Sequence, residues 1–473
     1  MERERKRFQH GFAFFVICYV LTHFIQLAFE TEFWENLLSF FGLAAFFCSL
    51  LYLRIKEIIL PLFLMGFAFC IAVIDNHTLL TSVFWDGATT MRALISTLLI
   101  IPIVGWVLKQ EDYVKDTVIL FKNKLKNSQT LYFLLLWLTQ VIGFFLNFGS
   151  IAVVYQIVES FFKKQNSESW QRFKSSAILR GFSFTTMWVI SIPSFAYAVE
   201  VIGAPLSLAL SQGFFVAVVG SMLSLILLRF YEVRRRISFS EDIQKAIQEA
   251  LQKETNEKHW RNPLEFFVLF VTLVLFTTIA KALFDASLLI VIPIAVFIWA
   301  VLFFAFKRRL PVFIHEGKKY VKDGVAAQAR EISILYAASF LISALTSSGL
   351  SVTVMTRLYE WTEMIPGLNF LWILPLIVLL FGFFGLGPLT VMVLIAGIVK
   401  SIHLPYPPEL IVLAMTLGSS LSVLISPLVI PVLFLSSVNG ISPVQNSVKQ
   451  NWLFAIGLYF IVQLYIQLRI GTF

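Results

Sequence analysis

Charged residues are scarce in this sequence. Only 14% of the 473 residues are Asp, Glu, Lys or Arg, whereas 58% are hydrophobic, and the mean hydropathy is +0.82. A soluble globular chain is about a quarter charged, so this composition excludes a water-soluble enzyme, a nucleic-acid-binding protein and a disordered regulator. The length suffices for about ten helices of about 20 residues. We therefore expect an all-α polytopic membrane protein.

The residues of metal and redox chemistry are also few. The three cysteines (Cys18, Cys48 and Cys70) all fall inside apolar runs, and an odd number in such runs gives no disulfide framework. The six histidines are scattered, with no H-E-x-x-H motif and no Cys-His cluster. The sequence therefore predicts neither an enzyme nor a resident cofactor, and Na⁺ enters below only as a coupling ion.

Uninterrupted apolar runs predict eleven transmembrane helices. A basic N-terminus precedes the first run, which is too long and aromatic for a signal peptide and ends at Glu30-Thr31-Glu32 without a small-residue cleavage site. We read it as an uncleaved span. The predicted spans are residues 11–29, 35–53, 57–74, 91–108, 181–203, 206–228, 264–282, 287–306, 331–350, 409–435 and 452–468.

Two further apolar runs, residues 131–158 and 370–399, are interrupted near their middles at Asn147–Ser150 and Gly385–Pro388. An arm of about 14 residues rises about 21 Å, too little to cross about 30 Å of hydrocarbon. If both runs are re-entrant hairpins, 32 of the 37 Lys and Arg residues lie on the cytoplasmic side, as the positive-inside rule requires. If the first run crossed instead, three predicted cytoplasmic segments that carry 20 of these charges would lie outside: residues 163–180, 229–261 and 307–330. We therefore predict hairpins over residues 131–163 and 370–400.

This topology divides the chain into four parts. Residues 1–34 form an extra N-terminal span, residues 35–229 a first repeat, and residues 264–473 a second repeat. Residues 230–263 form a charged cytoplasmic linker, whose periodicity over Ile243–Leu251 suggests a surface helix. Five crossings per repeat is an odd number, so the repeats must be inverted. The prediction is a multi-pass cell-membrane protein with a cytoplasmic N-terminus and an outer C-terminus.

Each predicted hairpin is followed by a span that carries serine and proline in mid-membrane, at Ser191-Ile192-Pro193-Ser194 and at Gly418–Pro427. Proline breaks a helix interior, and unwound backbone at bilayer depth lines cavities or is packed in protein. Paired breaks in inverted halves indicate a midplane transport site. The candidate substrate- and ion-binding residues are Asn147, Gly149, Ser150, Ser191, Ser194, Gly385, Gly387, Thr390, Ser419, Ser422 and Ser426.

The chemistry of these candidates is neutral. Hydroxyl, amide and carbonyl oxygens suit a monovalent cation such as Na⁺, and half-helix N-termini suit an anion. The alternative is that the small residues only allow close helix packing. No acidic residue lies at either hairpin tip or break, which disfavours a carboxylate-based proton relay and leaves other routes of proton coupling open.

The motifs resemble those of the ion transporter superfamily, which includes divalent-anion/sodium symporters, arsenite and sodium/proton exchangers, and citrate and C4-dicarboxylate carriers. The resemblance covers roughly residues 35–470. It is carried by Phe145-Leu146-Asn147-Phe148-Gly149-Ser150, by Phe384-Gly385-Leu386-Gly387-Pro388-Leu389-Thr390, and by Gly418–Pro427 with Asn439-Gly440-Ile441-Ser442-Pro443 and Asn451-Trp452.

The resemblance implies a cation site at Asn147, Gly149 and Ser191 and a mirror site at Gly387, Thr390 and Ser426, with substrate between the tips. It also implies a homodimer with an elevator-like moving domain, and a scaffold made of the early spans of each half. The full Ser-Asn-Thr tip sequence of the dicarboxylate symporters is absent here, so no dicarboxylate specificity is implied.

The expected function is secondary active transport of a small anion, coupled to Na⁺, by alternating access. The expected partners are that anion and membrane lipids, and not nucleic acid. Two alternatives from another class stay open: a flippase or exporter for a lipid-linked anion, and a membrane-embedded transferase. A transferase should cluster acidic or histidine residues near an interface, whereas a flippase would hold anionic headgroups on basic interfacial segments.

Overall fold

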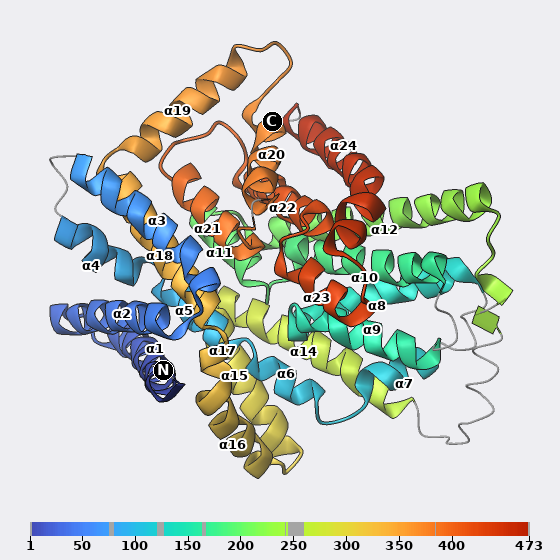
Figure 1. The fold of residues 1–473 in the computed structure, drawn as a ribbon, viewed down its shortest axis with the longest axis horizontal. Helices are drawn as coiled ribbons and strands as arrows, with labels where there is room; N and C mark the ends of the chain where they lie inside the picture. Colours follow the sequence, from blue (N-terminus) through green and yellow to red (C-terminus); the bar gives the residue numbers. More distant parts are fainter. Residues whose placement is uncertain are drawn as a thin grey trace. The chain divides into compact units, whose positions relative to one another are not determined.

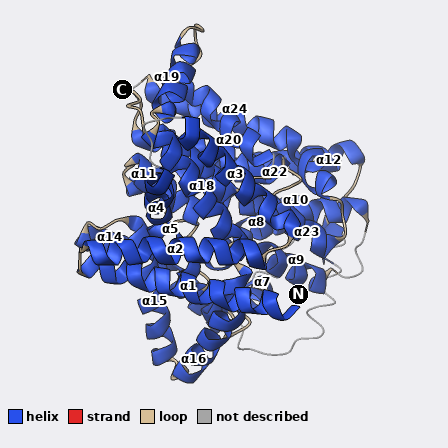
Figure 2. Ribbon diagram, turned by 60° about the vertical axis from the view of Figure 1, so that its left-hand side comes forward, coloured by secondary structure: helices blue, strands red, loops and turns tan. Residues whose placement is uncertain are grey.

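The computed structural model describes residues 2–74, 80–120, 127–162, 167–241, 243–244, 260–383 and 385–471. The elements in this part of the chain are helices joined by loops, without a strand (Figure 2). Twelve of these helical segments are long and apolar enough to cross a membrane. The predicted fold class, an all-α polytopic membrane protein, is confirmed.

The number of candidate spans is one higher than the eleven predicted, because α8 (Ser128–Leu146) qualifies. This first arm of the first predicted hairpin has 19 residues and rises about 28 Å, so the expected arm of about 14 residues is wrong here. Asn127 extends the helix by capping it, since its Oδ1 accepts from the Thr130 amide at 2.8 Å. The second arm, α9 (Gly149–Phe161), has only 13 residues. The second predicted hairpin would have short arms of 14 and 12 residues, α20 (Phe370–Phe383) and α21 (Pro388–Val399).

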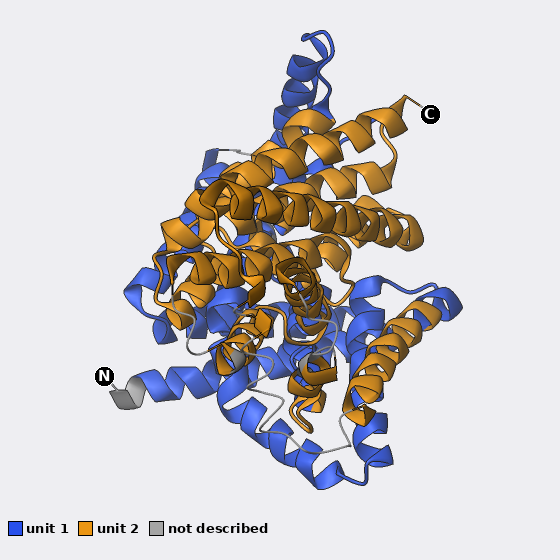
Figure 3. Ribbon diagram, turned by 90° about the vertical axis from the view of Figure 1, so that its right-hand side faces the viewer, with its two compact units in different colours: residues 1–106, 280–370, 393–405 blue, residues 107–279, 371–392, 406–473 orange. Residues whose placement is uncertain are grey.

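The chain folds into two compact units that interleave along the sequence (Figure 3). Unit 1 comprises Met1–Trp106, Ala280–Phe370 and Val393–Pro405, and unit 2 comprises Val107–Ile279, Leu371–Met392 and Tyr406–Phe473. Unit 1 therefore takes most of the early spans of both predicted repeats, but the predicted span 264–282 lies mainly in unit 2. Unit 2 takes the residues around both hairpin tips and both broken spans.

Unit 1 is a bundle in which α18 packs against α2, α3 and α4, and α1 packs against α2. Hydroxyl groups tie its helices to neighbouring carbonyls: Tyr19 donates to Ala88 at 2.6 Å, Thr97 to Leu289 at 2.8 Å, and Ser339 to Gly87. The helices assigned wholly or mainly to it are α1 (Glu2–Ala28), α2 (Glu32–Tyr52), α3 (Ile55–Ile74), α4 (Leu80–Thr90), α5 (Arg92–Ile100), α6 (Ile103–Leu108), α15 (Leu288–Phe306), α16 (Leu310–Lys319), η2 (Tyr320–Gly324), α17 (Val325–Ala327), α18 (Ala329–Ser347), α19 (Leu350–Glu363) and α21 (Pro388–Val399), which is divided between the units after Met392.

Unit 2 is built around α10, which packs against α8, α9, α12 and α22 (Figure 1). Its core is continuous along α10, where every residue from Phe173 to Met187 is buried. The remaining helices assigned wholly or mainly to this unit are α7 (Tyr113–Leu120), α11 (Pro193–Ile202), α12 (Leu206–Arg235), α14 (Arg261–Phe284), α22 (Pro408–Ile425), α23 (Ile430–Asn439), η3 (Gln445–Lys449) and α24 (Gln450–Ile470), with α10 spanning Glu168–Trp188.

One predicted span boundary is wrong. The sequence predicts a span beginning at Gly181, but α10 begins at Glu168, 13 residues earlier. The apolar run is cut short by charged residues, yet Lys174 and Arg180 of this segment are buried within unit 2 because each has polar partners there. The predicted surface helix over Ile243–Leu251 lies mostly outside the described residues.

Candidate functional site

Both predicted helix breaks are confirmed. The first broken span is α10 followed by α11, with residues 189–192 unwound and Pro193 at the first position of the new helix. The second is α22 followed by α23, which begins after the Ser426-Pro427 segment, and Pro431 occupies its first turn. Proline fits the first turn because its missing N–H needs no partner there. Two new helix N-termini therefore begin inside the spans.

The first hairpin tip turns at Asn147. Its backbone has φ 48° and ψ −126°, a conformation that a residue with a side chain seldom adopts. The Asn147 carbonyl accepts hydrogen bonds from the Ser150 amide at 3.1 Å and the Ser150 hydroxyl at 2.7 Å. Gly149 begins α9 directly after this turn. The strained turn is thus held by local bonds and places the start of α9 next to the end of α8.

The second tip turns at Gly385, which has φ 87° and so requires glycine. Gly387 has open space where a Cβ would stand. Thr390 lies in the first turn of α21 and is 6% exposed. Phe384, which belongs to the tip motif, lies outside the described residues.

A serine at each break bonds to the helix that leads into a hairpin tip. Ser191 donates its hydroxyl proton to the carbonyl oxygen of Phe144, in the last turn of α8. Ser426 donates in the same way to the carbonyl oxygen of Phe383, the last residue of α20, at 3.4 Å. Both serines are buried. Each broken span is therefore bonded in the same way to the helix that precedes a predicted hairpin tip.

The helices behind these contacts also approach each other in the same way in both halves. A Cβ added to Gly181 of α10 would lie 2.5 Å from the carbonyl oxygen of Leu136 in α8. A Cβ added to Gly418 of α22 would lie 2.5 Å from the carbonyl oxygen of Pro375 in α20. Leu136 and Pro375 each lie seven residues before the glycine of a Gly-Phe-Phe sequence, at residues 143–145 and 382–384. This repeated tripeptide was a signal of correspondence in the sequence.

In the part of the chain that the structure describes, several polar atoms beside the breaks lack hydrogen-bond partners. The hydroxyl groups of Ser419, Ser420 and Ser422 on α22 are buried and form no hydrogen bond, and the Ser422 hydroxyl faces Gly382 of α20. In the first half, Gln140 of α8 accepts from the Trp188 indole at 2.9 Å, but its buried amide nitrogen is unpaired. Buried polar groups are nearly always hydrogen-bonded to protein or water, so these atoms are available to water or to a bound ligand.

The structure thus gathers the candidate residues in two groups. Asn147, Gly149, Ser150 and Ser191 come together around the end of α8, with Ser194 in the first turn of α11. Gly385, Ser422 and Ser426 come together around the end of α20, with Ser419 one turn from Ser422 on α22. In the described part of the chain no hydrogen bond joins Ser150 to Thr390. That the two tips share one site stays a prediction.

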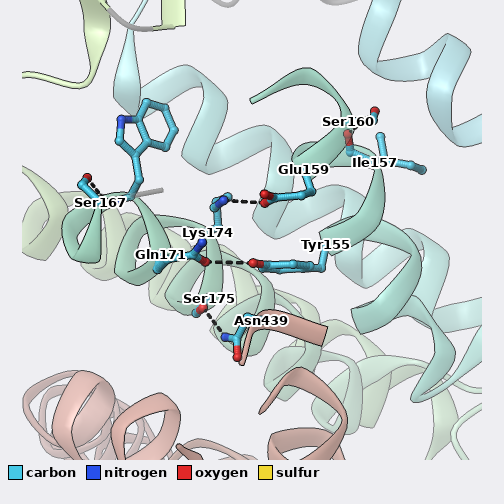
Figure 4. Close-up of polar contacts among 10 residues, drawn as sticks. Tyr155, Ile157, Glu159, Ser160, Ser167, Gln171, Lys174, Ser175 and Asn439 are labelled. Atoms are coloured by element: carbon cyan, nitrogen blue, oxygen red, sulfur yellow. Dashed lines mark hydrogen bonds and ion pairs between the residues drawn. The ribbon is translucent and has the colours of Figure 1, made fainter. Parts of the chain in front are cut away.

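Sequence reasoning missed a buried ion pair between the first hairpin and the first broken helix. The Lys174 ammonium of α10, fully buried, lies 2.6 Å from the Glu159 carboxylate of α9, whose side chain is 31% exposed (Figure 4). One turn away, the Tyr155 hydroxyl donates to Gln171 at 2.8 Å. Treating residues 163–180 as a cytoplasmic loop hid these contacts.

It also missed a polar network beyond the second break. Asn439, at the end of α23, donates to Ser175 of α10 and to Asn446, both at 2.9 Å. Asn451 of α24 donates to the Asn446 carbonyl at 2.8 Å and accepts from the Arg180 guanidinium at 3.0 Å. The asparagines quoted for the family resemblance therefore tie α23 and α24 to α10.

Together, the apolar spans and the two broken helices define a multi-pass membrane protein of all-α class. No protein-family model and no curated protein matches this chain.

Proposed function

We propose that this protein is a carrier rather than an enzyme: a secondary active transporter that moves a small anion, coupled to Na⁺, by alternating access. The observation that carries the proposal is the pair of serine bridges in unit 2, from Ser191 to Phe144 and from Ser426 to Phe383. Broken helices paired with helical hairpins in two matching sets are the arrangement that secondary transporters use at their substrate sites. The matched contacts of Gly181 and Gly418 support an inverted repeat.

The chemistry beside the breaks supports the choice of ions. The unpaired hydroxyls of Ser419, Ser420 and Ser422 are neutral oxygens, which together with unwound carbonyls suit Na⁺. The helices α9, α11, α21 and α23 all begin at a tip or after a break, and helix N-termini favour an anion. The residues present therefore fit both a monovalent cation and an anionic substrate.

The division into units supports the mechanism. Both tips and both broken spans belong to one compact unit, although residues 393–399 of α21 belong to the other. In this proposal the tips and the broken helices move together during alternating access. In this proposal both hairpins are re-entrant, the N-terminus is cytoplasmic, the C-terminus is outside, and the protein works as a homodimer in the cell membrane.

The test is uptake into proteoliposomes that contain the purified protein, with a panel of radiolabelled anions that includes citrate, a C4-dicarboxylate, sulfate and arsenite. We expect uptake of one anion class to require an inward Na⁺ gradient. Ser191→Ala and Ser426→Ala should each raise the Na⁺ concentration needed by about tenfold, because one charge-assisted oxygen contact contributes about 1.4 kcal/mol or more.

The matched control is Ser224→Ala in α12. Ser224 is also fully buried and donates to a carbonyl of its own helix at 2.9 Å, but it lies away from both breaks. Its Na⁺ requirement should not change. Uptake that ignores Na⁺ and follows an imposed pH gradient would contradict the Na⁺ assignment.

A lipid-linked-anion flippase is the second candidate, because unit 2 contains a cavity lined by arginines. Proteoliposomes also separate these functions. A flippase would move a fluorescent anionic lipid between leaflets and would leave every soluble anion outside.

A further inference from the structure

A cavity of about 500 Å³ lies within unit 2, between α10, α12 and the start of α24. Its lining carries four arginines, which are Arg172 and Arg180 of α10 and Arg234 and Arg235 of α12. Among the residues that the structure describes, no Asp or Glu lines it. Such an accumulation of positive charge around one cavity favours a negative ligand.

Arg180 is the most constrained of the four. It is 6% exposed, and its guanidinium lies over the Phe454 ring, 4.5 Å from the centroid. Its Nε donates to Asn451 at 3.0 Å and one terminal nitrogen to the Gln450 carbonyl at 3.4 Å. The Tyr132 hydroxyl, which also lines the cavity, is a further neutral side-chain partner of Arg180. Within the described part of the chain, no carboxylate pairs with the Arg180 guanidinium. A buried charge normally has a counter-charge, so a partner is missing here.

The other guanidinium groups are positioned as well. Arg172 lies over the Tyr231 ring at 4.5 Å from the centroid, which fixes the plane of its donors. Arg234 and Arg235 are exposed at the end of α12, and in the described part of the chain neither forms an ion pair. Planar guanidinium forks bind phosphate oxygens in pairs.

The rim of the cavity is apolar. Phe230 of α12 is 56% exposed, and Trp452 and Leu453 of α24 are 53% and 46% exposed. All three line the cavity together with the arginines. The combination of arginines and exposed apolar side chains in one lining matches an anionic headgroup with an acyl chain beside it.

We propose that this cavity binds a phosphate group, carried by an anionic phospholipid or free in solution. The site is separate from the hairpin tips, because Arg180 lies eleven residues before Ser191 on the same broken span, about 16 Å along a helix. The proposal therefore does not depend on the transport function, and it assigns a role to the one deeply buried guanidinium in this segment.

The experiment is native mass spectrometry of the purified, delipidated protein, titrated with phosphatidylglycerol and, in parallel, with phosphatidylcholine. Thermal stability in rising inorganic phosphate, with chloride as the reference salt, gives the free-anion arm. We expect phosphatidylglycerol to bind at least tenfold more tightly than phosphatidylcholine, or phosphate to raise the melting temperature. Either result supports the site and identifies its source of phosphate.

Variants locate the binding. Arg180→Lys keeps the charge but loses the fork, and Arg234→Gln removes an exposed guanidinium with little risk to folding; each should weaken binding about tenfold. Arg229→Gln removes an equal charge from α12 outside the cavity lining and should leave binding unchanged. Equal binding of both lipids without a phosphate effect would overturn the proposal. The proposal would also be overturned if Arg229→Gln weakened binding as much as Arg234→Gln, since binding would then depend on overall charge and not on this cavity.

Discussion

The ion pair between Lys174 and Glu159 gives a quantitative prediction, because its two members are buried to different degrees. The Lys174 side chain is fully buried and the Glu159 side chain is 31% exposed, with 2.6 Å between the charged atoms. Glu159→Gln leaves an ammonium without a counter-charge inside unit 2. Lys174→Met leaves a carboxylate that can reach water and replaces the buried ammonium by an apolar side chain.

The expected costs follow from this asymmetry. Removing one member of a buried pair and leaving the other buried costs about 3–5 kcal/mol, which we expect for Glu159→Gln. Lys174→Met should cost about 1–2 kcal/mol, the magnitude of a lost charge-assisted hydrogen bond. The double variant should lie within about 1 kcal/mol of the wild type, since apolar replacements of buried pairs are often neutral. The non-additivity should then be at least about 3 kcal/mol, which is the upper end of the range for residues in contact.

The assay is equilibrium unfolding of the purified protein in mixed detergent micelles with rising SDS. The control cycle uses Arg357 and Glu360 of α19, which are 3.8 Å apart and 82% and 50% exposed; their variants should change stability by at most about 0.5 kcal/mol and add independently. The reasoning from burial would be refuted if Glu159→Gln lowered the free energy of unfolding no more than Lys174→Met. It would also be refuted if the double variant lost as much stability as the two single variants together.

Three other outcomes are expected. Asn147→Gly should stabilise the protein by about 1 kcal/mol in the same assay, because relief of about 1–3 kcal/mol of backbone strain exceeds the entropic cost of glycine. Na⁺-dependent uptake should fall in the same variant. Unchanged stability would show that the turn is not strained. Gly387→Val should abolish uptake, because a β-branched side chain restricts the turn. The unfolding midpoint should change little, because the structure has open space where the side chain would stand. Full uptake by the variant would show that Gly387 is not part of the site. Single cysteines at Asn127 and Ser167, both exposed, should react with an impermeant maleimide from the cytoplasmic side only, and labelling of one from outside would show that residues 131–158 cross the bilayer.

Much of the fold was accessible from the sequence because lipid imposes a simple rule. Backbone groups in hydrocarbon must bond within their own helix, so apolar runs and interruptions by proline or glycine mark helices and breaks directly. The breaks at Ser191–Pro193 and Ser426–Pro427 were predicted on that basis and are confirmed. The first arm, α8, was predicted too short, because its polar first turn lies outside the apolar run.

The site was less accessible, because its partners come from distant parts of the chain. Nothing local in the sequence shows that the Ser191 hydroxyl meets the Phe144 carbonyl or that Arg180 meets Asn451. In addition, a span predicted from hydropathy is an apolar run, so it ends where charged residues begin. Lys174 and Arg180 were therefore assigned to a loop, although each is buried among polar partners.

The predicted topology depends on the number of positive charges on each side of the membrane. Because Lys174 and Arg180 are buried in the protein interior, this number has to be counted again. Positive-inside bias is set by Lys and Arg in loops near the ends of spans, so Lys174 and Arg180 no longer count on either side. The number of charges misplaced by a crossing at residues 131–158 falls from 20 to 18, because these two drop out of the block at residues 163–180. The larger blocks at Arg229–Arg261 and Lys307–Arg330 are unchanged. The length of α8, 19 residues, no longer favours a hairpin over residues 131–163. The prediction of a hairpin now rests on the distribution of positive charges and on the 13-residue length of α9.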